Sequence, residues 1–376
     1  EKVEVDVDPR ARTADLDFAT RQMVELAKTL TLEDQAHGHL VILLDEPTSV
    51  LERAEIEILF ARVRALKARA SFIFVSHRLD EVLELSDRIY VMKDGAVVAD
   101  LPAKDANVTQ LHQLMVGRSL QAEYYREGLQ QPYRDEVVVE ASDLALGHAY
   151  RNVSFSLHAG EILGIAGVIG SGREELTRTL AGFAPHDGGT LRIGGRDVRL
   201  RTPAEAVDNG MGYIPRERRV EGLVLFLSVA ANITLGNLKS LTRHGLIDAR
   251  KERTLAARWV ERLRVKTPSI DALCLNLSGG NQQKVVLAKW LNAEAKVLIL
   301  DHPTRGLDVG AKEEVYELVR AVTGEGVAVI LTSDTLEETI GLSHTVLVMR
   351  DGAITHRTEA RPGAKPTQVE LIEHMV

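Results

Sequence analysis

The sequence has 376 residues, of which 45% are hydrophobic and 27% charged, so it is long enough for two domains with packed cores. A net charge of −8 without a run of lysines and arginines argues against nucleic acid as the main partner, and no apolar stretch approaches the ~18 residues that a membrane span needs. The single cysteine, Cys274, excludes an internal disulfide, favours a reducing cytosol and is predicted to be a small core residue rather than a nucleophile.

A repeat covers most of the chain. VILLDEPTSVL from Val41 matches VLILDHPTRGL from Val297, VMKDGAVV from Val91 matches VMRDGAIT from Val348, and TQLHQLMVG from Thr109 matches TQVELIEHMV from Thr367. A complete copy therefore spans residues 137–376, whereas residues 1–118 correspond only to the second half of a first copy. The opening EKVEVDVDPRAR resembles neither a secretory signal nor a natural start, so we expect the front of the first copy to be missing.

The first copy contains an apolar strand that ends in two carboxylates, Asp45 and Glu46, and a second apolar stretch that ends in Ser76 and His77. After it, residues 119–136 are polar and lack strong periodicity, which predicts an interdomain linker.

The second copy alternates strand and helix signals, which predicts an α/β fold. Strands are expected at 136–140, 152–157 and 161–166, then a glycine loop, then a helix over about 172–183 that carries Leu176, Leu180 and Phe183 on one face. Residues 225–265 are rich in helix signals. The short apolar runs 297–300 and 327–331 are typical of buried parallel strands.

The glycine loop, GVIGSGRE at residues 167–174, follows the pattern G-x-x-x-x-G-K-[ST] in its glycines but not in its last two residues. Gly167, Gly170, Ser171 and Gly172 let backbone N–H groups approach phosphate, and the following helix adds the positive end of its dipole. Arg173 replaces the lysine and keeps its charge in a planar fork. Glu174 replaces the hydroxyl that binds magnesium; it could itself ligate the ion, but it adds a second negative charge beside the phosphates. The loop therefore favours nucleotide binding over rapid hydrolysis; the alternative is a turn needed only for packing.

Further motifs follow in order: LSGGNQQ from Leu277, VLILDHPT from Val297 and GLD from Gly306. The ordered set resembles the ATPase of ABC transporters, with its Walker A loop, LSGGQ-like signature, Walker B strand and D-loop. The longer phrases LSGGNQQKVVLAKWL and HPTRGLDVGAK resemble the tandem ATP-binding subunit of bacterial monosaccharide importers of the ribose, xylose or galactose type. This resemblance covers essentially the whole chain. It implies ABC-type P-loop NTPase domains, each with a parallel-sheet core and antiparallel β and helical subdomains, in one partial and one complete copy.

The resemblance also implies roles for individual residues. In that family two domains pair head to tail around two ATP molecules, and each site combines the Walker motifs of one domain with the signature of the other. Asp45 and, in the second copy, Asp301 would hold Mg²⁺, Glu46 would polarise the attacking water, and His77 would sense the γ-phosphate. The signature residues Ser278, Gly279, Gly280 and Gln282 would bind the opposite ATP. Tyr150 stands where the family stacks an aromatic ring on adenine, although a packing role suits it equally well.

The second copy departs from the family at four catalytic positions: Arg173, Glu174, His302 in place of the glutamate, and Asp334 in place of the histidine. The signature of the first copy is also altered, because Asp17 would point a carboxylate at phosphate. All these changes fall in one composite site. The other site, in which Asp45, Glu46 and His77 meet residues 278–280, is intact in every part that the sequence contains. We therefore expect hydrolysis at the intact site, binding only at the degenerate one, and weak ATPase activity of this chain alone.

Two local alternatives concern residues near the catalytic positions. His302 beside Asp301 would suit a metal pair, but no third ligand is apparent, so loss of catalysis is the better interpretation. The stretch Gly212–Arg218 lies where the family contacts its membrane partner and lacks the usual glutamine. Arg216 or Glu217 is a candidate substitute, and the sequence does not choose between them.

The resemblance implies a peripheral protein on the cytoplasmic face of the cell membrane, whose partners are a permease and its substrate-binding protein, with no nucleic acid. One alternative is a soluble tandem ABC ATPase acting on ribosomes or nucleic acid, which we would expect to carry a long basic linker, unlike residues 119–136. Another is a non-catalytic remnant that only binds nucleotide. The transported solute does not contact such a subunit, so the sequence does not identify it.

Overall fold

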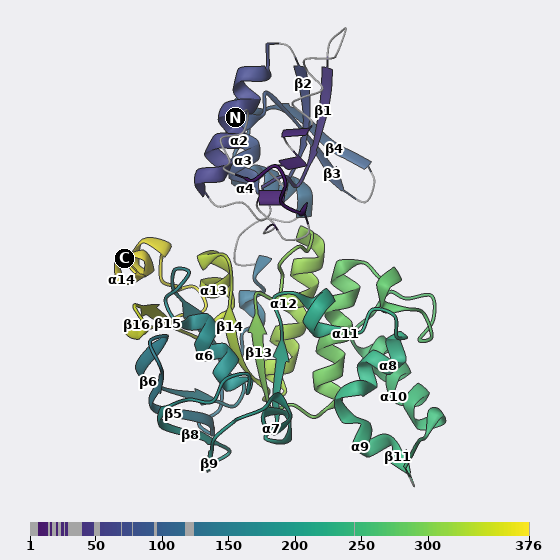
Figure 1. Cartoon of the computed structure of the whole chain (residues 1–376), viewed down its shortest axis with the longest axis vertical. Helices are drawn as coiled ribbons and strands as arrows, with labels where there is room; N and C mark the ends of the chain where they lie inside the picture. The colour runs from purple at the N-terminus through teal and green to yellow at the C-terminus, as the bar shows by residue number, and fades with distance from the viewer. Residues whose placement is uncertain are drawn as a thin grey trace. The chain divides into compact units, whose positions relative to one another are not determined.

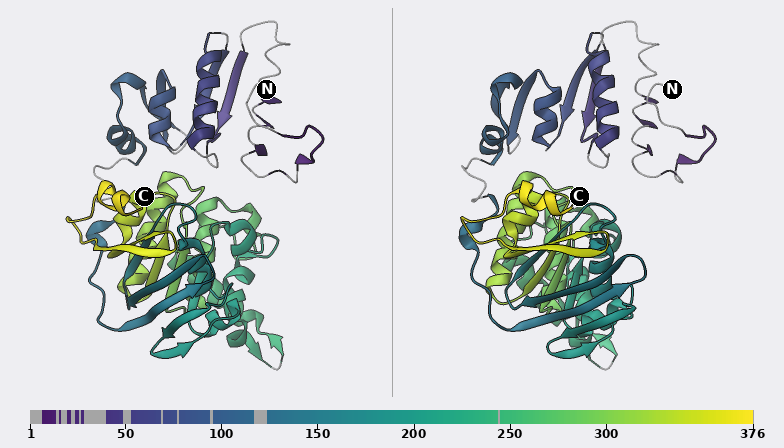
Figure 2. Two further views of the ribbon diagram at one scale, coloured as in Figure 1. Left: turned by 60° about the vertical axis from the view of Figure 1, so that its left-hand side comes forward. Right: turned by 90° about the vertical axis from the view of Figure 1, so that its left-hand side faces the viewer.

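The computed structural model describes residues 7–13, 16, 20–21, 24–25, 27–28, 40–48, 53–68, 70–76, 78–93, 96–116, 124–243 and 245–375. Within it the chain divides into two compact units, Glu1–Leu120 and Gln121–Val376 (Figures 1 and 2). Two residues of the predicted sites, Asp17 and His77, lie outside the described residues. None of the described helices combines the length and the hydropathy of a membrane span.

The first unit pairs two parallel strands and carries a separate antiparallel hairpin. Its elements are β1 (Leu40–Asp45), α2 (Arg53–Leu66), β2 (Ala70–Val75), α3 (Leu79–Leu85), β3 (Arg88–Lys93), β4 (Ala96–Pro102) and α4 (Val108–Val116). In the parallel pair Asp45 lies opposite Val75, while β3 pairs with β4 in the hairpin. Leu59, Phe60 and Val63 of α2 are buried in the small core of this unit, as the spacing of an amphipathic helix requires.

The second unit is built on a sheet of six strands in the order β10-β13-β14-β7-β15-β16. All neighbours are parallel except β15 and β16. The strands are β7 (Ile162–Ala166), β10 (Met211–Ile214), β13 (Val297–Asp301), β14 (Ala328–Thr332), β15 (Thr345–Arg350) and β16 (Ala353–Glu359). Every residue of β7, β13 and β14 is buried, because the sheet is covered on both faces, and this explains the continuous apolar runs of the sequence.

An antiparallel sheet of four strands, in the order β6-β5-β8-β9, covers one face together with α6. Helices cover the other face, and Figure 1 shows α8, α9 and α10 gathered at the side remote from β5 and β6. The remaining elements are β5 (Val137–Leu146), β6 (Tyr150–His158), α6 (Arg173–Leu180), β8 (Gly188–Ile193), β9 (Arg196–Val198), α7 (Pro203–Asp208), α8 (Val229–Thr234), α9 (Leu238–Leu241), β11 (Thr242–Arg243), β12 (Leu246–Ile247), α10 (Ala249–Arg262), α11 (Gly279–Asn292), α12 (Val309–Gly324), α13 (Leu336–Leu342) and α14 (Gln368–Met375).

The strands, the helix after the glycine loop and the helix-rich region expected from the sequence are thus all present, with ends that differ by a few residues. Cys274 is buried and free, and burial raises the pKa of its thiol to about 11, which confirms the prediction of a core residue.

The second half of the predicted linker packs onto the second unit. Tyr124 and Tyr125 each place their ring centroid 5.4 Å from that of Tyr316 on α12. Further along, Gln130 donates from Nε2 to the Ala360 carbonyl at 3.1 Å. Residues 124–136 are therefore held by the body of this unit.

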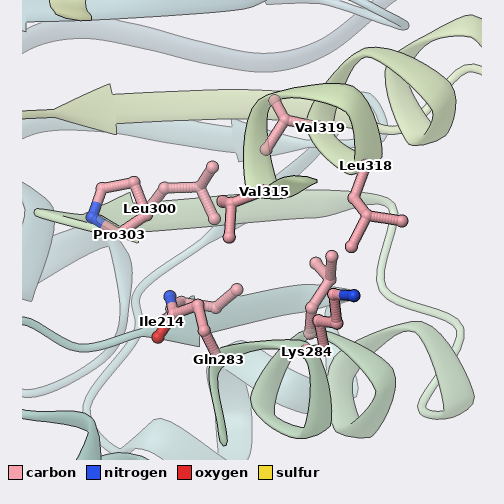
Figure 3. A pocket seen from close by; sticks show the side chains of 9 residues that line it. Ile214, Gln283, Lys284, Leu300, Pro303, Val315, Leu318 and Val319 are labelled. Carbon is pink, nitrogen blue, oxygen red and sulfur yellow. The ribbon is translucent and has the colours of Figure 1, made fainter. Parts of the chain in front are cut away.

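A narrow apolar gap lies between α11 and α12, beneath the ends of β10 and β13 (Figure 3). It is lined by Ile214, Gln283, Lys284, Leu287, Leu300, Pro303, Val315, Leu318 and Val319, and its volume is about 10 Å³. A space of that size barely accommodates one water molecule and has almost no polar lining, so it is a packing imperfection rather than a ligand site.

Candidate nucleotide site

The loop between β7 and α6 leaves no room for side chains at two of its glycines. A Cβ on Gly167 would lie 2.4 Å from Ser171 Oγ and 2.7 Å from the Met349 carbonyl, and a Cβ on Gly172 would lie 2.4 Å from the Ala149 carbonyl. Gly170 and Gly172 also have positive φ, +81° and +93°. Ser171 is buried, and its Oγ finds no hydrogen-bond partner among the described residues. A close backbone cradle at a helix N-terminus with an unused buried hydroxyl fits a phosphate group.

Arg173 and Glu174 open α6, but both are engaged within the protein. Arg173 is buried; its Nε donates to Glu174 Oε1 at 2.9 Å and its Nη1 donates to the Ser333 carbonyl at 3.2 Å. The guanidinium is thus directed at the end of β14, and the two side chains neutralise each other's charge.

Asp301, at the end of β13, is buried and accepts three hydrogen bonds from the protein. The Tyr213 hydroxyl donates to Oδ2 at 2.6 Å, while the Thr332 hydroxyl at 3.1 Å and His302 Nδ1 at 2.6 Å both reach Oδ1. Burial alone would raise the pKa of this carboxyl, but the hydrogen bonds from His302 and Tyr213 hold it below its usual value. Asp301 is therefore an ionised carboxylate whose two oxygens are already occupied.

His302 connects Asp301 to a second carboxylate. Its Nε2 lies 3.1 Å from Asp334 Oδ1, and Asp334 lies 3.6 Å from Arg216 Nη2. Burial opposes protonation of His302, yet its hydrogen bond with Asp301 and its close contact with the Asp334 carboxylate raise its pKa above the usual value. Burial likewise opposes ionisation of Asp334, but His302 and the nearby arginines lower its pKa to about 2. The three side chains form a chain in which the imidazole of His302 lies between two carboxylates.

These residues do not fit the magnesium ion that the fold family implies. Mg²⁺ requires oxygen ligands in near-ideal octahedral geometry, whereas both oxygens of Asp301 accept hydrogen bonds from the protein and a cationic ring lies against one of them. Within the described ranges no cluster of three histidine, cysteine or acidic residues is arranged to hold a metal. The hydrogen bonds from Tyr213, Thr332 and His302 therefore do not favour the predicted role of Asp301 as a metal ligand.

The signature segment begins α11 on the exposed surface. Ser278 precedes the helix and accepts from Asn281 Nδ2 at 2.8 Å. Small residues are required after it, because a Cβ on Gly279 would lie 2.7 Å from Arg218 Nη2 and one on Gly280 would lie 2.8 Å from the Ala311 Cβ. The backbone N–H groups of this helix start remain available to an anion, in agreement with the predicted role.

Gln282 and Tyr150, by contrast, face the interior. Gln282 is 3% exposed and donates from Nε2 to the Cys274 carbonyl at 3.0 Å. Its side chain therefore stabilises the start of α11 and does not reach the surface beside Ser278. Tyr150 is 1% exposed within the core beneath the antiparallel sheet, and no face of its ring is open for stacking on adenine. The burial of both residues does not favour the predicted contacts with nucleotide, and it favours the packing alternative for Tyr150.

In the first unit Asp45 ends β1 and Glu46 follows it with a φ of +48°. The Glu46 N–H donates to the Val75 carbonyl at 2.8 Å, and His302 in the second unit repeats this geometry with a φ of +52° and a bond of 3.0 Å to the Thr332 carbonyl. The two copies therefore present residues 46 and 302 in the same backbone conformation.

Sequence reasoning missed Tyr213 and Arg218 as parts of the site. Tyr213 reaches Asp301 from the neighbouring strand, while Arg218 donates from Nη1 to the Arg305 carbonyl at 2.6 Å and so ties residues 212–218 to the D-loop. Arg216 approaches Asp334, whereas Glu217 accepts from Arg305 Nη1 at 2.8 Å. The sequence offered no signal for the contact of Tyr213 with Asp301, because that contact depends on β10 lying next to β13.

Solved ATP-binding cassettes share the fold of the second unit. A nucleotide-free ATP-binding cassette from an ABC transporter superposes with a TM-score of 0.52 at 20% identity, covering 64% of this chain and 94% of its own. The cassette cbiO1 from Clostridium perfringens gives 0.51 at 19% identity, with coverages of 60% and 90%. A P-loop sheet with an antiparallel sheet and a helical region defines an ABC-type ATPase domain.

Sequence comparison gives the family. Residues 150–305 match the ABC transporter family. A putative ribose/galactose/methyl galactoside import ATP-binding protein of Burkholderia cenocepacia is 40% identical over 375 residues, which are 99% of this chain and 71% of that protein. The ribose import ATP-binding protein RbsA of Bacillus licheniformis is 42% identical over 356 residues, which are 94% and 71% of the two chains. The chain belongs to the ABC transporter family, in its group of ribose/galactose-type import ATP-binding proteins.

Proposed function

We propose that this chain is the subunit that binds and hydrolyses ATP to drive the import of a monosaccharide through a membrane permease. The similarity to import ATP-binding proteins along almost the entire chain carries this proposal. The phosphate cradle at Gly167–Gly172 and the helix-start signature at Ser278 support it, since both present backbone N–H groups to an anion.

Within this function we assign different roles to the two copies. The second copy supplies a degenerate site, because the residues at its hydrolytic positions, His302 and Asp334, bind each other. The first copy keeps Asp45 and Glu46 at the end of a strand in the family's order. We infer that the competent site combines these residues with His77 and with the signature at residues 278–280, across a head-to-tail pair of domains.

At the competent site each group would have a distinct task. Asp45 would hold Mg²⁺, which neutralises developing charge on the phosphates when bound. Glu46 would accept a hydrogen bond from the attacking water and orient it in line with the γ-phosphate, and His77 would contact that phosphate. Ser278 and the N–H groups of Gly279 and Gly280 would close the site from the other domain, binding the γ-phosphate and shielding it and the attacking water from bulk solvent.

The partner at the membrane is a permease, supplied by a substrate-binding protein, so the chain would act on the cytoplasmic face of the cell membrane. The segment after Arg218 offers an apolar docking surface for it, because Val220 is 80% and Phe226 75% exposed. The alternative of a ribosome- or nucleic-acid-dependent ATPase is not favoured, since the relatives named above are import proteins and the acidic chain lacks a basic linker.

The test uses protein that also carries a phosphate-binding loop for the first copy, and it compares Glu46→Gln with Gly167→Ala. Glu46→Gln should lower kcat for ATP at least about 100-fold, the usual contribution of such a base. Gly167→Ala should abolish nucleotide binding at the degenerate site and lower kcat by no more than about tenfold.

Gly128→Ala is the matched control, because Gly128, like Gly167, lacks a positive φ, but a Cβ there would meet no atom within 4 Å. Its turnover should equal that of the wild type. Survival of ATP turnover in Glu46→Gln would contradict the assignment of the competent site.

A further inference from the structure

The surroundings of Asp301 already use three of the roughly four lone-pair sites of its carboxylate. Oδ2 is taken by the Tyr213 hydroxyl, and Oδ1 is shared by Thr332 and His302. The side chain of Asp301 is 10% exposed, so water has little access to its lone pairs. A magnesium ion would compete with Tyr213 at Oδ2 and meet His302 at Oδ1, and Mg²⁺ gives up its own hydration shell reluctantly.

A positive charge already stands beside this carboxylate. The imidazole of His302 lies between Asp301 Oδ1 at 2.6 Å and Asp334 Oδ1 at 3.1 Å, and its side chain is 1% exposed. When protonated, the ring carries one positive charge, which offsets one of the two carboxylates; Arg216, 3.6 Å from Asp334, offsets the other. A divalent cation placed here as well would be repelled at close range, because the interior screens charge weakly.

The other expected metal ligand is also missing. The phosphate-loop pattern places a hydroxyl at position 174, where this chain has a carboxylate that accepts from Arg173 Nε at 2.9 Å. The guanidinium of Arg173 also reaches the Ser333 carbonyl, next to Asp334. Both sides of the site are thus closed by hydrogen bonds and ion pairs within the protein.

We propose that the nucleotide site of the second unit takes no magnesium, and that His302 supplies the positive charge that a metal ion would otherwise place beside Asp301. This deepens the proposed function, since it concerns the site that is assigned there as degenerate. The test of this proposal measures metal binding, whereas the test of the proposed function measures ATP turnover. A result that overturns one of them therefore does not overturn the other.

The experiment counts bound Mn²⁺ by electron paramagnetic resonance on the full chain, with and without ATP. Wild type and Asp301→Asn should bind the same number of ions, because Asp301 is not a ligand. Any Mn²⁺ bound by the first unit cancels in this comparison. A lower count in Asp301→Asn than in the wild type overturns the proposal.

A second variant removes the positively charged side chain of His302. His302→Asn leaves Asp301 and Asp334 without the charge between them, and asparagine tolerates the φ of +52° at this position. This variant should gain about one Mn²⁺ per chain, since two carboxylates then face the same space. The gain should disappear in the double variant His302→Asn with Asp301→Asn.

His148→Asn is the matched control, because His148 is exposed in the turn before β6, and its Mn²⁺ count should equal that of the wild type. Circular dichroism establishes that each variant is folded; His302→Gly, which also suits a positive φ, replaces His302→Asn if that protein does not fold. A folded variant that gains no Mn²⁺ overturns the role of His302 as the substitute for a metal ion.

Discussion

At the scale of single residues, Glu46 of the first copy and His302 of the second have the same backbone conformation but chemically different side chains. Glu46 and His302 both have a left-handed conformation, which non-glycine residues rarely adopt and which is found disproportionately at functional sites. In each copy the N–H of this residue bonds to the last carbonyl of the adjacent parallel strand, and this bond maintains the conformation. A carboxylate in that position can orient water, whereas the imidazole of His302 binds Asp301 and Asp334 instead.

His344 gives a prediction about pH at the same scale. Its Nδ1 accepts from the Ile162 N–H at 2.9 Å and its Nε2 lies 2.9 Å from the Gln131 carbonyl, so the folded protein requires the neutral ring. Burial lowers its pKa to about 4. As the pH falls from 7 to 4 the unfolded chain therefore binds a proton before the folded chain does. The free energy of unfolding should decrease by about 3 kcal/mol over this range, beyond the change contributed by other groups.

The measurement is urea unfolding at pH 7 and pH 5, an interval over which about 2 kcal/mol of this decrease should appear, followed by tryptophan fluorescence. Both tryptophans, Trp259 and Trp290, belong to the second unit, so the signal reports on that unit. His344→Asn should be less stable at pH 7 but should show a shallower pH dependence, whereas exposed His148→Asn should keep the slope of the wild type. An equal slope in His344→Asn and wild type would refute the assignment.

At the scale of elements, one buried amide organises the segment that exposes Phe226. Asn232 on α8 is fully buried; its Oδ1 accepts from the Val224 N–H at 2.9 Å, and its Nδ2 lies within hydrogen-bond distance of the carbonyls of Val224, Leu227 and Ser228. These bonds fix the turn before α8, and they therefore fix the apolar surface that we assign to the permease.

Asn232→Ala should lower the free energy of unfolding by roughly 2–3 kcal/mol, because it leaves several buried backbone groups without partners. Amide exchange at residues 224–228 should become faster, as measured by hydrogen–deuterium exchange with mass spectrometry. Asn237→Ala is the control, since Asn237 makes a single side-chain bond, to the Asn292 carbonyl at 3.0 Å, and should cost about 1 kcal/mol. Unchanged exchange at 224–228 in Asn232→Ala would show that other contacts hold the segment.

Elements could be predicted from the sequence more completely than contacts. The strands at 297–301 and 328–332 were evident because central parallel strands are buried on both faces and therefore consist of apolar residues. The contact of Tyr213 with Asp301 was not evident, because it depends on β10 lying next to β13, an order that sequence periodicity does not encode. The motif pattern likewise located Gln282 and Tyr150 on their elements but could not show that their side chains face the core.

At the scale of the whole molecule, the repeat places similar sequences in different surroundings. The strand pair β1/β2 has the register of β13/β14, with Asp45 opposite Val75 and Asp301 opposite Thr332. In the second unit the antiparallel sheet and α6 cover one face of this pair. The described part of the first unit contains no equivalent of that layer, so the residues on its open face are more than half exposed: Val41 55%, Leu43 71%, Ile73 53% and Val75 51%.

This difference predicts unequal effects of one substitution made in both copies. Ile330 and Ile73 hold the same place in the repeat, but Ile330 is fully buried and Ile73 is 53% exposed. Ile330→Ala should lower the free energy of unfolding of the second unit by about 2–5 kcal/mol, through lost burial and a residual cavity. Ile73→Ala should cost the first unit less than about 1 kcal/mol, since it removes little buried area. Chemical unfolding followed by tryptophan fluorescence measures the first effect, and far-ultraviolet circular dichroism the second. Equal losses would mean that the open face of β1 and β2 is covered in solution.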